Sequence, residues 1–192
     1  DLVQSKLESA GFKSIIIKGE YKHGSIEEQG YRKILQESSL EVEPCENSTG
    51  GIYGWVEENL ERIRSFYHTY TGSKGAIICN SVFAAKRVYS LLKQELVNDN
   101  IRVGENTGLT GKAARLESLE QELVVATSTV DVGVDFRINL LIFESLDAGS
   151  FIQRLGRLGR HPEFPTYQAI SLLPKYLCER FEKAFEDGST VE

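Results

Sequence analysis

The chain is poor in the residues that build metal sites and disulfide frameworks. It has three cysteines among 192 residues, at positions 45, 79 and 178, and no two of them form a CxxC pair. An odd number of widely spaced cysteines argues against both a disulfide framework and a zinc site. The three histidines, His23, His68 and His161, are equally scattered, so we expect no metal site. No HD pair occurs, so we also expect no metal-dependent nuclease of the HD type.

Long apolar runs and excess positive charge are also missing. No stretch approaches the roughly 20 apolar residues needed to cross a bilayer, so we expect no membrane partner. The net charge is −6 at pH 7, which disfavours a dedicated DNA-binding module, since such modules usually carry a basic face. Any nucleic-acid contact should therefore be local or be completed by another domain.

From residue 74 onward, apolar strand patterns alternate with amphipathic helix patterns. The strands are expected at residues 76–79, 101–103, 123–126, 140–143 and 169–173. Helices are expected at residues 82–96, 112–119, 149–158 and from 174 to about 185. Repeated β-then-α units predict an α/β domain in which a parallel β-sheet is flanked by helices on both faces.

The first 73 residues have a weaker pattern. Strands are expected at residues 14–18 and 40–42, a turn at residues 47–51, and one amphipathic helix at residues 52–70. We therefore divide the chain into an N-terminal extension, residues 1–73, and a domain core, residues 74–192, that ends in a C-terminal helix.

The strongest chemical signal is the segment QRLGRLGR at residues 153–160. Glycines separate three arginines at a spacing of three residues, and a guanidinium can hold a phosphate through two parallel hydrogen bonds. Such a group can act as an arginine finger, which stabilises charge on a transferring γ-phosphoryl group. The alternative is a solvated basic helix end, in which glycines inside the helix would be a cost without a purpose.

A second signal is the segment ATSTVDVGVDF at residues 126–136, which begins where the expected strand 123–126 ends. Ligands of open parallel sheets gather at such carboxyl ends, and hydroxyl groups and backbone amides there can bind phosphates. Gly133 permits close approach of a ligand, and Asp135 could accept a hydrogen bond from a ribose hydroxyl. Taken alone, the segment also fits an ordinary strand-to-loop transition.

Together these two segments resemble motifs V and VI of superfamily 2 helicases. Upstream, Thr107, Gly108 and Leu109 with Arg115 resemble the HG…R element, with Thr107 where histidine is common, and AIICNS at residues 76–81 resembles motif IV. The resemblance covers residues 74–161 in the correct order. Within the superfamily the chain is most similar to CRISPR-associated helicases, although Asp131 stands where they usually have glutamate. The run FIQRLGRLGRH resembles the type I-D branch, in which helicase and nuclease are separate polypeptides.

The resemblance implies that the chain is the second RecA-like motor domain of a helicase and gives roles to matched residues. Gln153, Arg157 and Arg160 would face the γ-phosphate of ATP, with the two arginines as fingers. Gly133 and Asp135 would lie near the ribose of the nucleotide. The sugar-phosphate backbone of the translocated strand would be contacted by Asn80, Ser81, Gly108 and Thr127. Arg154 would order the interface between the two motor domains.

The same resemblance implies cofactors and partners. ATP would bind with Mg²⁺, held mainly by a first RecA-like domain that this sequence does not contain, so the chain alone should not hydrolyse ATP. Single-stranded DNA is the implied track, a CRISPR surveillance complex and a separate nuclease are the implied partners, and the prokaryotic cytoplasm is the implied location. Residues 106–113 (NTGLTGKA) only partly match a phosphate loop, because they lack its first glycine and its Mg²⁺-binding hydroxyl.

Two other functions remain open from the residues. An RNA helicase shares the same ordered motifs, since only recognition of the 2′-hydroxyl separates RNA from DNA. A non-catalytic RecA-like docking module would keep the fold without the chemistry. The intact pair Arg157 and Arg160 argues against docking alone, because nothing in docking requires both.

Overall fold

The computed structural model describes residues 2–13, 35–46, 50–130, 135, 137–185 and 188–189. The chain forms two compact units, Asp1–Lys33 with Val191–Glu192, and Ile34–Thr190. The first contains helix α1 (Leu2–Ser9), and the strand expected at residues 14–18 lies outside the described residues. The second unit begins at residue 34, whereas the sequence places the start of the core at residue 74. No helix in the described ranges is long and apolar enough to cross a membrane.

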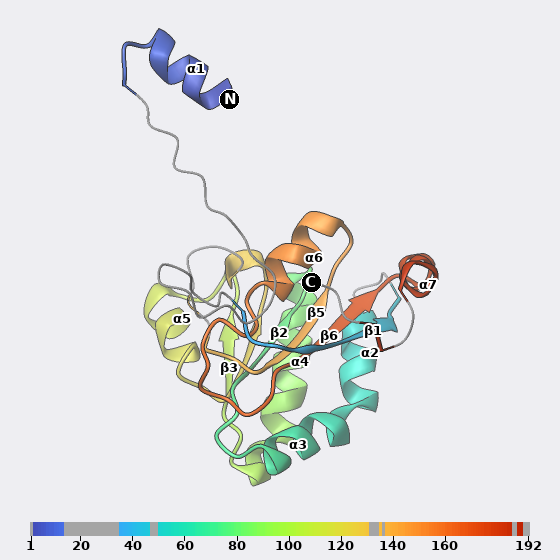
Figure 1. The fold of residues 1–192 in the computed structure, drawn as a ribbon. Coiled ribbons are helices and arrows are strands. Elements are labelled where there is room, and N and C mark those ends of the chain that lie inside the picture. Colours follow the sequence, from blue (N-terminus) through green and yellow to red (C-terminus); the bar gives the residue numbers. More distant parts are fainter. Residues whose placement is uncertain are drawn as a thin grey trace. The chain divides into compact units, whose positions relative to one another are not determined.

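A single parallel sheet organises the larger unit (Figure 1). Its strands are β1 (Ser39–Pro44), β2 (Gly75–Ile78), β3 (Val103–Asn106), β4 (Leu123–Ala126), β5 (Leu140–Glu144) and β6 (Gln168–Leu173). The strand order is β1-β6-β5-β2-β4-β3, and all neighbouring pairs run parallel. The predicted α/β fold class is confirmed. The expected strand at residues 101–103 is displaced, because pairing with β4 begins at Val103 and continues to Asn106.

Helices cover both faces of this sheet. They are α2 (Gly51–Glu58), α3 (Leu60–Thr69), α4 (Val82–Glu95), α5 (Lys112–Ser118), α6 (Ala148–Leu155) and α7 (Lys175–Ala184), with short 3₁₀ turns at Val97–Asp99 and Ser128–Val130. Neighbouring residues of a strand point to opposite faces, so Ile77 packs in one core with residues of α2, α3 and α4, whereas Ala76 and Ile78 pack in a second core with Leu158.

The helix expected at residues 52–70 is two helices. Asn59 separates α2 from α3 with φ −108° and ψ 18°, and its side-chain amide donates to the Trp55 carbonyl at 2.8 Å. The Trp55 carbonyl also accepts from the Asn59 backbone N–H at 3.0 Å, so the side chain adds a second donor to a carbonyl at the end of α2. The amphipathic period continues through the break, which is why the sequence pattern did not show it.

Strand β1 forms one edge of the sheet and is held there by polar contacts. Arg62 of α3 pairs with Glu41 and Glu43 at 2.7 and 2.5 Å. The Trp55 indole donates to Glu43 at 2.7 Å, and Gln168 of β6 donates to Glu41 at 2.7 Å. Acidic side chains on an edge strand discourage pairing with another chain, and these bonds fix β1 to the sheet as well.

Candidate nucleotide and nucleic-acid site

The four residues expected to contact nucleic acid lie at one edge of the sheet. Asn80 and Ser81 follow β2, Thr127 follows β4, and Gly108 lies in the loop after β3. These three strands are neighbours in the order β2-β4-β3 and all run parallel, so their carboxyl ends meet at this edge. Backbone hydrogen bonds join the segments, since Thr127 N donates to the Asn106 carbonyl at 3.3 Å.

Two of these side chains already have partners in the fold. Ser81 is the N-cap of α4, and its hydroxyl accepts from Phe83 N at 3.2 Å and Ala84 N at 3.4 Å. The Asn80 side-chain oxygen accepts from Arg154 at 2.8 Å. Thr127 is only 6% exposed, whereas a Cβ added at Gly108 would meet no atom within 4 Å. Gly108 is therefore the most accessible of the four positions.

The loop after β3 is ordered by buried polar contacts. Thr107 is fully buried and donates to Glu105 at 2.9 Å, and Lys86 of α4 pairs with Glu105 at 3.1 Å. Burial by itself raises the pKa of Glu105, but the hydrogen bonds from Lys86, Thr107 and Thr110 outweigh it and hold that pKa below its ordinary value. Arg115 donates to the Thr110 carbonyl at 2.7 Å. Lys86 and Arg115 are thus occupied by protein groups.

The arginine-rich segment forms a helix end followed by a short loop. Asp147 caps α6 by accepting from Ser150 N at 2.9 Å, and the helix ends at Leu155. The expectation that it continues to Leu158 is wrong. Gly156 has left the helix, and Gly159 has a φ of +72°, a left-handed conformation that favours glycine.

The predicted phosphate-facing residues are gathered on this helix and loop. Gln153 is exposed on α6, and Arg160 is exposed and donates from Nε to the Gly156 carbonyl at 2.7 Å. Arg157 is only 7% exposed. The arrangement places two guanidinium groups three residues apart on one turn, and Arg157 would need to become more exposed before it could contact a phosphate.

Arg154 has a different position from the one its spacing suggests. It is 4% exposed, and its guanidinium donates to the Asn80 side chain and to the Glu144 carbonyl. Arg154 therefore ties α6 to the carboxyl ends of β2 and β5. The expectation that it orders an interface with another domain does not agree with this burial.

Glu144, at the end of β5, is a residue that the sequence analysis did not identify. Its carboxylate accepts from Asn80 N at 2.7 Å. Burial raises its pKa, opposed by this hydrogen bond and by the charge of Arg154. The available signal was a carboxylate directly after an apolar strand, at the edge where ligands of parallel sheets gather.

Asp135 connects the two motif segments. It pairs with His161 at 2.9 Å, and this hydrogen bond is the main cause that lowers the pKa of Asp135. His161 directly follows Arg160, so the contact fixes the end of the arginine loop to the segment that precedes β5. Gly133, the other expected ribose contact, lies outside the described residues.

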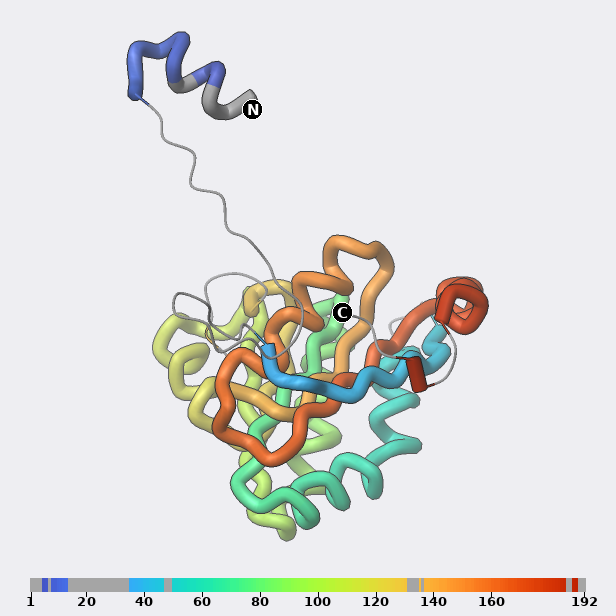
Figure 2. The backbone as a smooth tube through the Cα atoms, in the orientation of Figure 1, coloured from blue at the N-terminus to red at the C-terminus, as the bar shows by residue number. Residues whose placement is uncertain are grey.

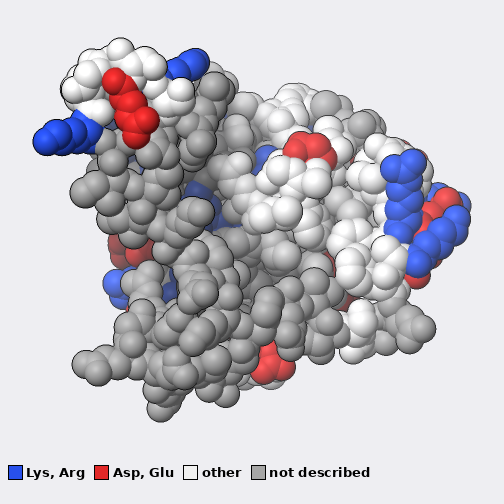
Figure 3. All heavy atoms as spheres, turned by 45° about the horizontal axis from the view of Figure 1, so that its top comes forward, with Lys and Arg blue, Asp and Glu red and all other residues white. Residues whose placement is uncertain are grey.

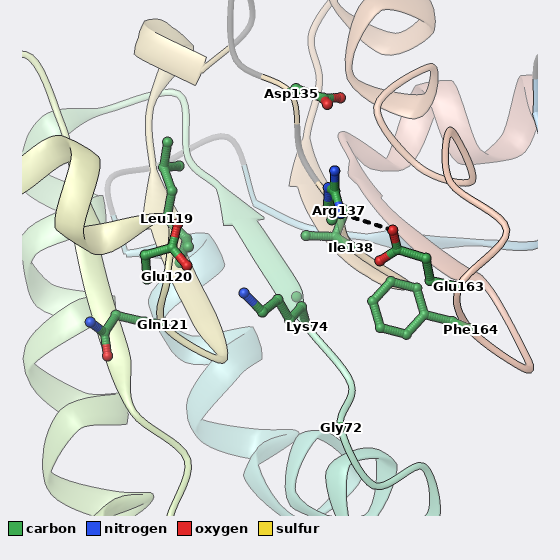
Figure 4. A pocket seen from close by; sticks show the side chains of 12 residues that line it. Gly72, Lys74, Leu119, Glu120, Gln121, Asp135, Arg137, Ile138, Glu163 and Phe164 are labelled. Atoms are coloured by element: carbon green, nitrogen blue, oxygen red, sulfur yellow. Dashed lines mark hydrogen bonds and ion pairs between the residues drawn. The ribbon is translucent and has the colours of Figure 1, made fainter.

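A hollow of about 590 Å³ lies at the opposite ends of the strands (Figure 4). Its walls include Lys74 before β2, Gln121 before β4 and Ile138 before β5. Figure 4 shows Lys74 between the segment 119–121 and Phe164, while Arg137 pairs with Glu163 at 3.0 Å. Two cations and three carboxylates line this hollow, so it offers no excess positive charge to a phosphate ligand.

Charge on the visible surface is mixed as well. With the top of Figure 1 tilted forward, the described Lys and Arg side chains are separated by neutral surface or stand next to acidic ones (Figure 3). Within the described ranges, no three His, Cys, Asp or Glu side chains are grouped closely enough to hold a metal ion.

Comparison with known proteins agrees with the order of the motifs. Residues 71–163 match the family model described as CRISPR-associated nuclease/helicase Cas3, C-terminal. No curated protein sequence gives a significant match.

Many solved structures resemble the fold, and three of them illustrate the likeness. One, described as a CRISPR-associated protein, has a TM-score of 0.58 at 17% identity over 89% of this chain and 21% of its own. Mss116p bound to single-stranded RNA and AMP-PNP has a TM-score of 0.56 at 19% identity over 76% of this chain and 30% of its own. T. fusca Cas3 with ATP has a TM-score of 0.54 at 20% identity over 77% of this chain and 19% of its own. This chain therefore spans less than a third of each of these proteins.

Proposed function

We propose that this chain is the ATP-responsive second motor domain of a DNA translocase. The proposal starts from the match of residues 71–163 to the family model described as CRISPR-associated nuclease/helicase Cas3, C-terminal. It has the fold of a superfamily 2 helicase motor domain. The observation that carries the proposal is the loop after α6, which holds Arg157 and the exposed Arg160 three residues apart, directly after the helix whose Arg154 bonds to the carboxyl ends of β2 and β5.

On the nucleotide side, the residues fit a triphosphate that approaches from another domain. Arg160 and Gln153 are exposed, and Arg157 follows on the same turn. Guanidinium groups suit phosphate oxygens because they offer two parallel donors and a permanent charge. The Asp135 side chain is 63% exposed and can accept a hydrogen bond from a ribose hydroxyl. Gly133 is assigned to the same contact with the ribose. Mg²⁺ is assigned to the first RecA-like domain, as the family resemblance implies.

On the nucleic-acid side, the proposed track runs along the ends of β2, β4 and β3. Asn80, Ser81, Gly108 and Thr127 offer amides and hydroxyls there, which contact phosphates without reading bases. ATP hydrolysis would then drive a hinge motion between the two RecA-like domains. Each motion would move the carboxyl edge of the sheet one step along the single nucleic-acid strand. In the cell, the motor would act with a CRISPR surveillance complex and a separate nuclease, in the prokaryotic cytoplasm.

The proposal is tested with a protein that contains both RecA-like domains. ATP hydrolysis is measured with single-stranded DNA, with single-stranded RNA and without nucleic acid, and DNA is expected to stimulate most. Arg157→Ala and Arg160→Ala should each lower kcat by roughly 10³ with little change in KM, because a finger acts on charge that develops in the transition state. Arg157→Lys should not restore activity, since an ammonium lacks the planar two-pronged geometry.

The rival functions give different results in the same assay. Equal or greater stimulation by RNA would favour an RNA helicase. A docking module would hydrolyse no ATP, either as wild type or with the arginines changed. It would still bind its partner after both arginine changes. Near-normal kcat in both alanine variants would refute the assignment of the fingers.

A further inference from the structure

The finger loop, residues 156–160, is held to α6 at its start. Arg157 N donates to the Arg154 carbonyl at 2.9 Å, and Leu158 N donates to the Leu155 carbonyl at 3.0 Å. The Leu158 side chain is 2% exposed in the core of that sheet face. These contacts fix the loop as far as Leu158. The backbone conformation of Gly159 then determines the direction of the chain.

At Gly159 the loop meets a segment from the beginning of the unit. Gln36 N donates to the Gly159 carbonyl at 2.7 Å. A Cβ added at Gly159 would lie 3.0 Å from Gln36 N and 3.2 Å from Gln36 O. The two backbones are therefore in direct contact, and the left-handed φ of Gly159 adds a second reason why glycine is needed. Figure 2 shows the segment that leads into β1 passing beside the loop.

The segment before β1 is itself fixed. Ser39 N donates to the Tyr167 carbonyl at 3.0 Å, and β1 then pairs with β6 from Ser39 to Pro44. Tyr167 also holds the far end of the loop, because its hydroxyl donates to the His161 carbonyl. Gln36 thus connects Gly159 to the segment before β1, and Tyr167, which accepts from that segment, also bonds to the residue that follows the finger loop.

We propose that Gln36 is a positioning residue for the two arginine fingers. Its backbone N–H and its close contact with Gly159 set the direction of the loop, and so the direction in which Arg157 and Arg160 approach a phosphoryl group. This inference rests on the proposed function. One backbone hydrogen bond contributes little to overall stability, whereas misplacing a catalytic group by about 1 Å can cost roughly 10² in rate. Loss of the contact should therefore affect kcat far more than folding.

The test uses the protein with both RecA-like domains and removes the donor. Gln36→Pro deletes the N–H, because proline has none. The matched control, Glu37→Pro, introduces the same ring at the exposed next residue. Relative to Glu37→Pro, Gln36→Pro should lower kcat by about 10- to 100-fold, with the same KM for ATP and the same unfolding temperature. Gly159→Ala, which places a methyl group against Gln36, should lower kcat in the same way.

A double variant separates positioning from a general structural effect. If Gln36 acts through the fingers, Gln36→Pro should cause little further loss once Arg160→Ala is present, whereas independent effects would multiply. Equal kcat for Gln36→Pro and Glu37→Pro, or multiplicative losses in the double variant, would overturn the inference alone. A wild-type kcat in Arg160→Ala would instead overturn the proposed function.

Discussion

The arginines at positions 154, 157 and 160 are evenly spaced in the sequence, yet they have different surroundings. Arg154 and Arg157 are buried, and Arg160 is exposed. Arg154 is itself buried and bonds to Asn80 and to the Glu144 carbonyl, so its removal breaks both bonds and leaves a void beside the strand ends. We expect Arg154→Ala to lower the free energy of unfolding by about 3 kcal/mol.

The matched control for this prediction is Arg160→Ala, which removes the same group from an exposed position. It should change the free energy of unfolding by less than about 0.5 kcal/mol. Denaturant unfolding of the isolated chain measures both values. Equal stabilities for the two variants would show that Arg154 does not hold α6 to the strand ends.

Glu144 gives a pH dependence of defined sign. Burial raises its pKa above the ordinary value of 4.5, so in the window above pH 4.5 the folded state binds more protons than the unfolded state. Stability then falls as pH rises through the folded-state pKa. Glu144→Gln keeps an acceptor for Asn80 N without the charge, so the variant should gain stability relative to wild type as pH rises from 4.5 to 8.

Asp135→Asn provides a control of opposite sign, measured by denaturant unfolding as pH falls below the ordinary pKa of 3.8. The pKa of Asp135 is lowered by His161, so this carboxylate stabilises the fold above its unfolded pKa and loses that effect as pH falls. Its exposure makes the effect small. If the difference between Glu144→Gln and wild type did not vary with pH, the raised pKa of Glu144 would be wrong.

At the scale of elements, the buried strands were the easiest to predict. Parallel strands covered on both faces are continuous apolar runs, and β4 begins and ends at the expected residues. Helix ends were harder. The spacing of Leu155 and Leu158 continues a helical period, but the backbone turns at Gly156 and Gly159. A period in the sequence shows which residues face the core and does not show whether the backbone between them stays helical.

The candidate site was predictable in its position but only partly in its contacts. The motif order places the expected residues at the carboxyl edge of a parallel sheet, and the structure describes Asn80, Ser81, Gly108 and Thr127 there. The bond from Arg154 to Asn80 joins residues 74 positions apart, and the Gln36 contact with Gly159 is longer still in sequence. Such pairs depend on strand order, which no local pattern contains.

At the scale of the whole molecule, the charge distribution determines how the isolated chain should bind a single strand. The net charge is −6, and two cations near the track are already used, since Lys86 pairs with Glu105, and Arg154 is buried. Binding should therefore be weak and depend mainly on amides and hydroxyls. The slope of log affinity against log salt should be shallow, at roughly −0.7 for each phosphate neutralised.

Fluorescence anisotropy with a labelled oligothymidylate, titrated at several salt concentrations, measures that slope. Gly108→Glu adds a carboxylate at the most open position of the track, where a Cβ meets no atom within 4 Å, and should weaken binding further. Gly54→Glu makes the same charge change in α2, also in open space, and should have little effect because α2 follows β1, the edge strand opposite to β3. Tight binding that is insensitive to salt, or equal loss in both variants, would show that the single strand does not follow the carboxyl edge of the sheet.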